Sequence, residues 1–412
     1  MSLGLAFLLL VACLGIACQT EPQGGDSEEG GDTLKIAAAA IAGPEGAGSP
    51  GVFDDEIIFG QSAAFTGSAR FLGTGMRLGI EAAFHEVNRV GGVHGRRLTL
   101  ETLDDAYEPN HALANTKLLI ENRKVFALIG AVGTPTSRVT APLAHEVGVP
   151  FIAPFTGAEF LRDPELDNVF NLRASYYQET EEMVARLTED LGVTRVGVLY
   201  QNDSYGQNGL EGTTLALERR GLTPVASGHY ERNTRAVKSA VDQIMEADPE
   251  AIIMVSSYSP AARTVELARR EADPVLMAVS FVGSRALANA LGAEGEGVYV
   301  TQVVPDPHDG GNPVVARYHA ALGNYDARAE PGFVSLEGYL AGRLAIAGLD
   351  ACGRELSREC FVKALQIAES IDIDGLPLKF GPGDNQGSDA VFLTVIGPDG
   401  KDRQVERLEG TR

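Results

Sequence analysis

Short β-branched and apolar runs alternate with longer segments of helical periodicity along most of this chain. The apolar runs predict strands at Ile57–Gln61, Arg97–Thr102, Val125–Ile129, Phe151–Ala153, Arg195–Tyr200, Ala251–Val255, Val275–Val279 and Gly297–Thr301. Helix-length segments lie between them, among others Met76–Arg89, His111–Arg123, Gln178–Leu191 and Gly206–Arg220. This alternation favours an α/β protein with doubly wound parallel sheets that helices cover on both faces. We find no fixed-period repeat, which argues against a solenoid or a propeller.

The N-terminal segment does not show this alternation of strand-like and helix-like segments. Residues Leu3–Ile16 are almost wholly apolar, too few to span a bilayer comfortably and typical of the core of a signal peptide. Cys13 and Cys18 each follow small and apolar residues, as in the lipobox of bacterial lipoproteins, whose cysteine is lipidated. Cys18 is favoured because a polar segment starts directly after it; Cys13, with a leucine three residues before it, is the alternative. No Lys or Arg precedes Lys35, so the basic n-region of a signal peptide is missing, which leaves open a start codon upstream. The alternative to a lipoprotein signal is an ordinary cleaved signal with incidental cysteines.

A Gly-, Glu-, Ala- and Pro-rich stretch without aromatic residues runs from Gln19 to about Pro50. Such a composition buries too little apolar surface to offset chain entropy. We therefore expect residues 1–18 to be a lipoprotein signal with its lipidation cysteine, and residues 19–55 to be a disordered tether. The tether would hold a globular body away from a membrane.

Composition narrows the function of that body. Its roughly 360 residues are enough for two domains with substantial cores. The formal net charge of -22 argues against nucleic-acid binding and against electrostatic docking on an anionic bilayer. Two of the four cysteines, Cys352 and Cys360, lie eight positions apart around a predicted turn. In an oxidising compartment this spacing predicts a local structural disulfide, and without a Cys-x-x-Cys or histidine partner it does not indicate a metal site.

The chain offers only weak catalytic motifs. Residues Gly60–Ala64 approach a nucleophile elbow but end in alanine, and His85–Arg89 begins like a zinc-binding helix without the second histidine. Gly73 and Gly75 lack the third glycine of a dinucleotide fingerprint, and there is no Walker phosphate loop. We predict a protein that is not an enzyme and that needs neither a metal nor another cofactor.

Two strand exits carry helix-start chemistry. Thr134, followed by proline, is a good N-cap, and the amides of Thr136 and Ser137 would remain free to face an anion. After the next strand, Thr156 and Glu159 form a capping-box pattern. Ligands of open α/β sheets bind at the carboxyl ends of strands, so these loops are candidate site elements. The alternative is that the hydroxyls only cap their own helices.

Several punctuated motifs follow one another in a fixed order, which is far more specific than any single motif. They are Ile57–Gly60, Phe65–Ser68, Asn88–Arg97, Asp104-Asp105, Val125–Gly130, Gly133–Ser137 and Val149–Pro154. This order resembles the first lobe of the leucine/isoleucine/valine-binding protein family, the solute-binding subunits of certain ATP-driven (ABC) importers. The resemblance continues to about Val395.

The resemblance implies a type I periplasmic binding protein fold with two doubly wound lobes joined by a three-strand hinge. Lobe one would hold residues 56–174 and 303–376, and lobe two residues 175–302 and 377–412. It also implies a monomer that is exported, lipid-anchored to the membrane, and facing the periplasm or the cell exterior. A small solute would be captured by hinge closure and delivered to an ABC permease in the membrane. The alternative is a sensor that presents a small acid or amide to a signalling receptor.

The resemblance also implies site residues. Thr134 falls where the family places a hydroxyl that binds the ligand's α-carboxylate, and Phe155, Thr156 and Gly157 fall on the neighbouring loop. In the second lobe, Tyr205 and Tyr258 match cleft tyrosines. Without the family context, both would be read as half-buried packing residues.

One departure from the family concerns the ligand. Ser280 stands where amino-acid binders often place a glutamate that pairs with the ligand's ammonium group. An amine in a dry cleft needs a charged partner. Glu179, beside Tyr176, and Glu337 are candidates. The expected ligand is a small carboxylate, with a branched-chain or related amino acid as the first expectation and an acid without an α-amine as the alternative.

Overall fold

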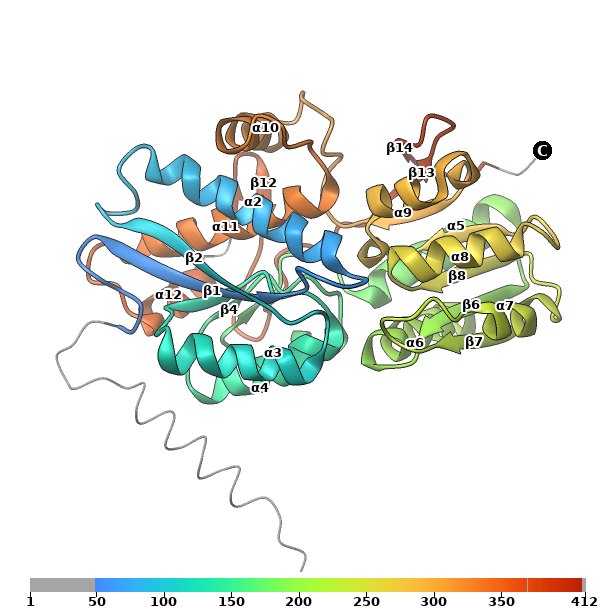
Figure 1. Cartoon of the computed structure of the whole chain (residues 1–412), viewed down its shortest axis with the longest axis horizontal. Coiled ribbons are helices and arrows are strands. Elements are labelled where there is room, and N and C mark those ends of the chain that lie inside the picture. Colours follow the sequence, from blue (N-terminus) through green and yellow to red (C-terminus); the bar gives the residue numbers. More distant parts are fainter. Residues whose placement is uncertain (1–48, 369, 410–412) are drawn as a thin grey trace, which may run out of the picture.

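A computed structural model describes residues 49–368 and 370–409 of the chain, which form two α/β lobes side by side (Figure 1). The predicted signal peptide, both candidate lipidation cysteines (Cys13 and Cys18) and most of the tether lie outside the described residues. The α/β class with mostly parallel sheets, predicted from the alternation of strands and helices, is confirmed.

Lobe one is built on a five-stranded parallel sheet in the order β2-β1-β3-β4-β5. Its strands are β1 (Glu56–Ala63), β2 (Arg97–Asp104), β3 (Ala127–Ile129), β4 (Phe151–Ile152) and β5 (Val169–Phe170). Its helices are α2 (Arg70–Asn88), α3 (Pro109–Lys117), a π-helical turn (Leu118–Asn122) and α4 (Thr134–Glu146). Helix α2 packs against α11 (Phe333–Cys352) on one side of the sheet, and α3 packs against α4 on the other (Figure 1).

Lobe two is built on a seven-stranded sheet in the order β14-β13-β10-β9-β8-β6-β7. The parallel strands are β6 (Val196–Gln201), β7 (Ala226–Tyr230), β8 (Ala251–Val255), β9 (Val275–Ala278) and β10 (Tyr299–Gln302), and the antiparallel edge is β13 (Phe392–Ile396) with β14 (Asp402–Val405). The helices are α5 (Tyr176–Leu191), α6 (Ser204–Glu218), α7 (Lys238–Met245), α8 (Tyr258–Ala268) and α9 (Ser284–Leu291). Every residue of β8 is buried, as expected for a parallel strand covered on both faces.

After β10 the chain returns to lobe one. Helices α10 (Pro313–Tyr325) and α11 pack on α2, and α12 (Arg358–Ile367) and the hairpin of β11 (Ile371–Ile373) and β12 (Leu376–Leu378) follow. The next segment still contacts lobe one: the rings of Phe380 and Phe170 lie 5.6 Å apart, and the Gly387 N–H donates to the Asn171 carbonyl at 2.7 Å. In the same segment, Gln386 Nε2 donates to Gln178 Oε1 on α5 of lobe two at 2.8 Å, so residues 380–387 contact both lobes. The expected lobe boundaries stay a prediction.

Residues 49–55, which we expected in the disordered tether, instead lie against lobe one. The Ile58 N–H donates to the Gly51 carbonyl at 2.9 Å, and Val52 forms a bridge with Ile57. Gly51 has a φ of +76°, and an added Cβ would lie 2.2 Å from the Phe126 nitrogen. Only glycine fits this conformation and this approach. The ordered body therefore starts before β1.

The local disulfide expected from the spacing of two cysteines is present. Cys352, at the end of α11, and Cys360, in α12, form the expected disulfide, with Cα atoms 5.9 Å apart. Within residues 49–368 and 370–409, no helix has the length and apolar character that a membrane span needs.

Candidate functional site

The carboxyl ends of β3 and β4 bring two threonines together. Thr134 Oγ1 and Thr156 Oγ1 lie 2.7 Å apart, and both side chains are buried. Thr134 is the first helical residue of α4 and Gly133 is the N-cap, so the expected Thr134 cap is not formed. The Ser137 N–H donates to the Gly133 carbonyl at 3.0 Å and is therefore not free to face an anion, in contrast to the expectation.

The expected capping box after β4 is not formed either. Glu159 begins a 3₁₀ turn whose N-cap is Ala158. The Thr156 hydroxyl instead accepts a hydrogen bond from the Ala158 N–H at 3.3 Å. Thr156 Oγ1 also lies 3.3 Å from the Tyr176 hydroxyl at the start of α5. This hydroxyl therefore links the β4 loop to lobe two.

Aromatic rings from both lobes pack around this pair of threonines. Phe281 is central: its ring centroid lies 4.6 Å from that of Tyr205 and 5.7 Å from that of Phe155. The ring of Tyr176 lies 5.3 Å from that of Tyr205. We call the set the packed cluster; its members are fully or almost fully buried, and they are Thr134, Phe155, Thr156, Tyr176, Tyr205 and Phe281.

Gly157 allows the close approach of α5 to the β4 loop. Its carbonyl accepts from the Tyr176 N–H at 2.7 Å. An added Cβ would lie 2.7 Å from the Tyr176 nitrogen and 2.8 Å from its ring. The absence of a side chain at this position is therefore a packing requirement.

A buried charged group adjoins the packed cluster. The guanidinium of Arg173 lies 4.7 Å from the ring centroid of Phe155, and the side chain is fully buried. Its Nη2 lies 3.5 Å from Glu179 Oε1, and its Nη1 lies 3.7 Å from Glu337 Oε1. Nη2 also donates to the Ser280 hydroxyl, whereas Nε and Nη1 have no hydrogen-bond partner. Arg173 thus joins Glu337 on α11 of lobe one to Glu179 and Ser280 of lobe two.

Glu179 has its acceptor positions occupied. It accepts from the Ser280 N–H at 2.8 Å, from the Ser280 hydroxyl at 3.0 Å and from the Thr301 hydroxyl at 2.5 Å. Together with Arg173, these contacts fix the loop after β9 to the start of α5. The carboxylate acts here as an internal anchor.

Burial changes the protonation chemistry of the cluster. It raises the pKa of Tyr176 to about 12, so this hydroxyl stays neutral. Burial also raises the pKa of Glu337 to about 7, against the opposing effect of Arg173. Burial alone would lower the pKa of Arg173, but the two neighbouring glutamates raise it on balance. The arginine therefore keeps its proton, and Glu337 changes charge near neutral pH.

Polar contacts join the lobes at one rim of their interface. The Arg232 guanidinium in lobe two lies 2.8 Å from Glu108 in lobe one, and Asn233 Nδ2 donates to the same carboxylate at 2.6 Å. Tyr258, the remaining predicted cleft residue, is half-buried, and its ring lies 5.4 Å from that of Phe71 on α2. Tyr258 thus lies at the interface of the lobes, in contact with Phe71.

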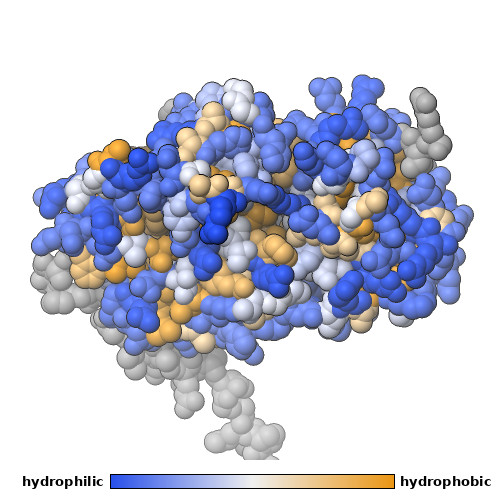
Figure 2. All heavy atoms as spheres, turned by 45° about the horizontal axis from the view of Figure 1, so that its top comes forward, coloured by the Kyte–Doolittle hydropathy of each residue, from blue (hydrophilic) through white to orange (hydrophobic). Residues whose placement is uncertain are grey.

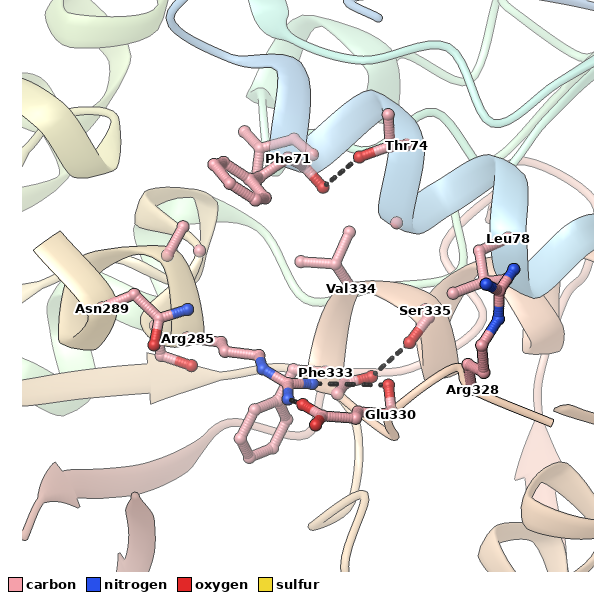
Figure 3. A pocket seen from close by; sticks show the side chains of 16 residues that line it. Phe71, Thr74, Leu78, Arg285, Asn289, Arg328, Glu330, Phe333, Val334 and Ser335 are labelled. Atoms are coloured by element: carbon pink, nitrogen blue, oxygen red, sulfur yellow. Dashed lines mark hydrogen bonds and ion pairs between the residues drawn. The ribbon is translucent and has the colours of Figure 1, made fainter. Parts of the chain in front are cut away.

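A cavity of about 390 Å³ lies beside this contact, between α2, α9 and the start of α11 (Figure 3). We call it the α2–α9 cavity. Phe71, Leu72 and Leu78 line it from α2, and Phe333 and Val334 line it from α11. Its walls come from both lobes, and its size falls in the range of small-molecule sites.

The charged side chains at this cavity are Arg285, Arg328 and Glu330. Arg285, on α9, forms an ion pair with Glu330 and donates to the Pro331 carbonyl at 3.1 Å, so it joins lobe two to the loop before α11 (Figure 3). Arg328 is 94% exposed and lies 3.7 Å from Asp326. The face drawn in Figure 2 is mostly hydrophilic, with hydrophobic residues in separate patches. Among the described residues, no group of three His, Cys, Asp or Glu side chains could hold a metal ion.

Sequence reasoning found the threonines of the packed cluster, Phe155 and both tyrosines, but missed Phe281 and the adjoining Arg173. Arg173, three residues after β5, was not singled out, because an arginine that follows a strand is usually a surface residue. Phe281 stood next to Ser280 and was not assigned a role. Arg285 and Phe71 line the cavity from helices far apart in the chain, and no local pattern joins them.

Comparison with known proteins shows which solved structures and curated relatives this chain is similar to. A crystal structure of a possible leucine/isoleucine/valine-binding protein from Rhodopirellula baltica SH 1 has a TM-score of 0.82 and 37% sequence identity, covering 86% of this chain and 98% of that one. Leu/Ile/Val-binding protein homolog 8 of Brucella abortus is 23% identical over 84% of this chain and 89% of its own length. For Leu/Ile/Val-binding protein homolog 7 of the same organism, at 25% identity, the match spans 54% of this chain and 57% of the relative.

The profile of one family covers nearly all of the described body. It is the profile described as periplasmic binding protein, and it matches residues 56–401, from the first residue of β1 to the turn before β14. The match therefore includes the whole five-stranded sheet, every strand of the seven-stranded sheet except β14, and all the elements that build the packed cluster and the α2–α9 cavity. On these grounds the chain belongs to the periplasmic binding protein family.

Proposed function

We propose that this protein is the extracytoplasmic solute-binding subunit of an ABC importer and that it captures a small carboxylate between its lobes. The observation that carries the proposal is the α2–α9 cavity, whose walls come from α2 and α11 of lobe one and α9 of lobe two. Membership in a ligand-binding, non-enzymatic family supports it. A branched-chain or related amino acid is the first class to test, and an acid without an amine is the second.

Capture would proceed by closure of the hinge. With the lobes apart, the β3 and β4 loops of lobe one, at Thr134 and Phe155–Gly157, would be exposed to the solute. Closure then brings in Tyr176, Glu179, Tyr205, Tyr258 and Ser280 from lobe two. The ligand favours the closed state only by its differential affinity for it. Contacts such as Arg232 with Glu108 and Arg285 with Glu330 define the closed surface that a permease would recognise.

Anchoring completes the proposal. We place the lipid on Cys18, with Cys13 as the alternative, so that the body stands on a tether at the outer side of a membrane. The body would act as a monomer, because one chain supplies both walls of the cavity.

A thermal-shift screen of the full chain against branched-chain amino acids and small carboxylic acids tests the function. A solute at a thousandfold excess over its dissociation constant adds about 4 kcal/mol to the free energy of unfolding. The chain has no tryptophan, so an external dye is the suitable probe. Val334→Trp should fill the cavity and abolish the shift, whereas Val90→Trp, at a residue 83% exposed, should leave it unchanged. A screen without any saturable shift would overturn the proposal.

A further inference from the structure

The turn after β2 carries a tyrosine of lobe one that packs into lobe two. Tyr107 is only 1% exposed, although it lies outside helices and strands. Its ring centroid lies 5.9 Å from that of Phe281, and its hydroxyl accepts a hydrogen bond from Gln201 Nε2 at 3.3 Å. Phe281 follows β9 and Gln201 ends β6, so both partners belong to lobe two. Tyr107 therefore has these partners only while the lobes are close together.

The backbone of this turn is held in an uncommon conformation by lobe one itself. Ala106 and Tyr107 are consecutive non-glycine residues with φ values of +50° and +62°. Such residues are costly and persist only where the surrounding structure holds them in place. Asp104 accepts from the Ala106 N–H at 2.9 Å, and Asp105 accepts from the Tyr107 N–H at 2.8 Å and from the Ser62 hydroxyl at 2.8 Å. Lobe one thus presents Tyr107 in a preformed conformation.

A glycine of lobe one leaves room for the ring. An added Cβ at Gly133 would lie 2.2 Å from Cε2 of Tyr107. Gly133 is the N-cap of α4 and directly precedes Thr134 of the packed cluster. The ring of Tyr107 therefore lies against the β3 loop, which the proposed function exposes to the solute when the lobes are apart.

The residue after Tyr107 continues the contact between the lobes. Glu108 lies 2.8 Å from the Arg232 guanidinium and accepts from Asn233 Nδ2 at 2.6 Å. Asn233 Nδ2 also donates to the Ala106 carbonyl at 3.3 Å, and Asn233 Oδ1 accepts from the Ser68 hydroxyl at 2.5 Å. Arg232 and Asn233 follow β7 of lobe two, whereas their partners here belong to lobe one. A single loop of lobe two thus contacts the turn of lobe one at several points.

We infer that Tyr107 and Glu108 are positioning residues for capture: with Gln201, Arg232 and Asn233 they form an interlobe lock that holds the lobes closed and so sets how long a solute stays bound. The inference rests on the proposed function for this role. Because the turn is preformed in lobe one, closure loses little conformational entropy in ordering it. Other residues line the α2–α9 cavity, so the lock favours closure over any solute and does not select among solutes.

Cross-linking at a separate contact between the lobes tests the lock without any solute. The rings of Phe71 on α2 and Tyr258 on α8 lie 5.4 Å apart. Phe71→Cys and Tyr258→Cys place two thiols there, and bismaleimidoethane joins them only when the lobes are close. Peptide mapping of the full chain measures the rate at which this one bridge forms. This two-cysteine chain is the reference for the variants below.

Removal of the ring should slow the bridge. Tyr107→Gly should do so by about fivefold or more, because glycine adopts a positive φ freely and the variant loses the ring without added backbone strain. Ala106→Gly relaxes the same turn and keeps the ring, so it should leave the rate unchanged. An unchanged rate in Tyr107→Gly, or no bridge in any of the chains, would overturn the inference.

A third variant separates the lock from general stability. Phe84 is 3% exposed, and its ring packs against that of Phe59 within lobe one at 5.1 Å. Phe84→Leu should lower the free energy of unfolding and leave the rate of bridge formation unchanged. If Phe84→Leu slows the bridge as much as Tyr107→Gly does, the rate reports stability and the lock is wrong.

A double-mutant cycle tests the charged part of the lock. Glu108→Gln and Arg232→Gln should each slow the bridge about threefold, and the two together about threefold as well, because both remove one shared contact. A slowing of about ninefold in the combined variant would mean that the two side chains act independently, which contradicts the lock.

The lock and the proposed function can fail separately. A saturable thermal shift with unchanged bridge rates would overturn the lock and leave the proposed function standing. Bridge rates that depend on Tyr107, together with a screen in which no solute gives a shift, would overturn the proposed function and leave the contact between the lobes standing.

Discussion

The packed cluster and the α2–α9 cavity both lie between the lobes, yet they differ in how completely their polar groups are engaged. In the packed cluster, aromatic rings fill the space, and Arg173, Glu179 and Glu337 are buried almost entirely. At the cavity, Phe71 and Arg328 remain exposed, and one glutamate faces two arginines. The comparison separates two kinds of contact between the lobes: the packed cluster fills its space with buried rings and charges, whereas the cavity leaves apolar and charged side chains exposed.

The largest expected effect comes from breaking the buried charged group. Arg173→Met would leave Glu179 and Glu337 buried without a cation, which costs about 3–5 kcal/mol of the free energy of unfolding. Urea denaturation of the variant measures this cost. Adding Glu337→Gln to the variant should change this loss little at neutral pH, because without Arg173 the pKa of Glu337 rises further and its carboxyl is already neutral. A loss below about 1 kcal/mol would mean that the charged group does not stabilise the closed lobes.

A smaller effect depends on pH. Burial raises the pKa of Glu337 from its ordinary 4.5 to about 7, so the folded chain holds this proton where the unfolded chain has lost it. The free energy of unfolding therefore falls as pH rises from about 4.5 to about 7, by on the order of 3 kcal/mol, and is level above that window. Glu337→Gln should remove this part of the decline, and urea denaturation at pH 5, 6, 7 and 8 measures it. Burial also raises the pKa values of Asp105 and Asp402 to about 6, so the difference between wild type and variant is the quantity to compare. Parallel curves for the two chains would contradict the prediction.

The smallest effect on stability belongs to the cavity. Phe71→Ala should lower the free energy of unfolding by about 1 kcal/mol or less, because the side chain is 43% exposed. It should nevertheless raise the dissociation constant of a solute found in the thermal-shift screen about tenfold, since the ring forms one wall of the cavity and contacts Tyr258. Calorimetry and urea denaturation measure the two effects separately. Phe53→Ala, at a residue 49% exposed outside the cavity, is the control and should leave the dissociation constant unchanged. If both variants bind equally well, the cavity is not the site.

The same two regions show which residues of the candidate site could be predicted from the sequence alone. The threonines after β3 and β4 were predictable, because parallel strands end at one edge of a sheet, and their hydroxyls do meet. The role of Glu179 as an anchor was not predictable, because it depends on Ser280 and Thr301, which are more than a hundred residues away. The same holds for Arg173, since an arginine after a strand is usually a surface residue.

The cavity could not be predicted from the sequence for a different reason. Its walls come from α2, α9 and α11, and the periodicity of one helix contains no information about its distance from the others. Helix and strand assignments depend on periodicity within about twenty residues, whereas a cavity depends on how whole lobes are placed. The start of α2 at Arg70, six residues before the predicted start, also put Phe71 and Leu72 outside the predicted helix.

The path of the chain between the sheets has a consequence for limited proteolysis. After β10 the chain passes to α10 and α11 on lobe one, and later returns to lobe two for β13 and β14. A single nick near residue 308 therefore leaves each fragment holding elements of both lobes, whereas a nick near residue 174 separates the first part of lobe one from a fragment that holds lobe two together with α10, α11 and α12. The fragments stay joined through the β10–β13 ladder or through the packing of α11 on α2. Nicked protein should run as two bands on a denaturing gel while eluting as one intact particle from a sizing column.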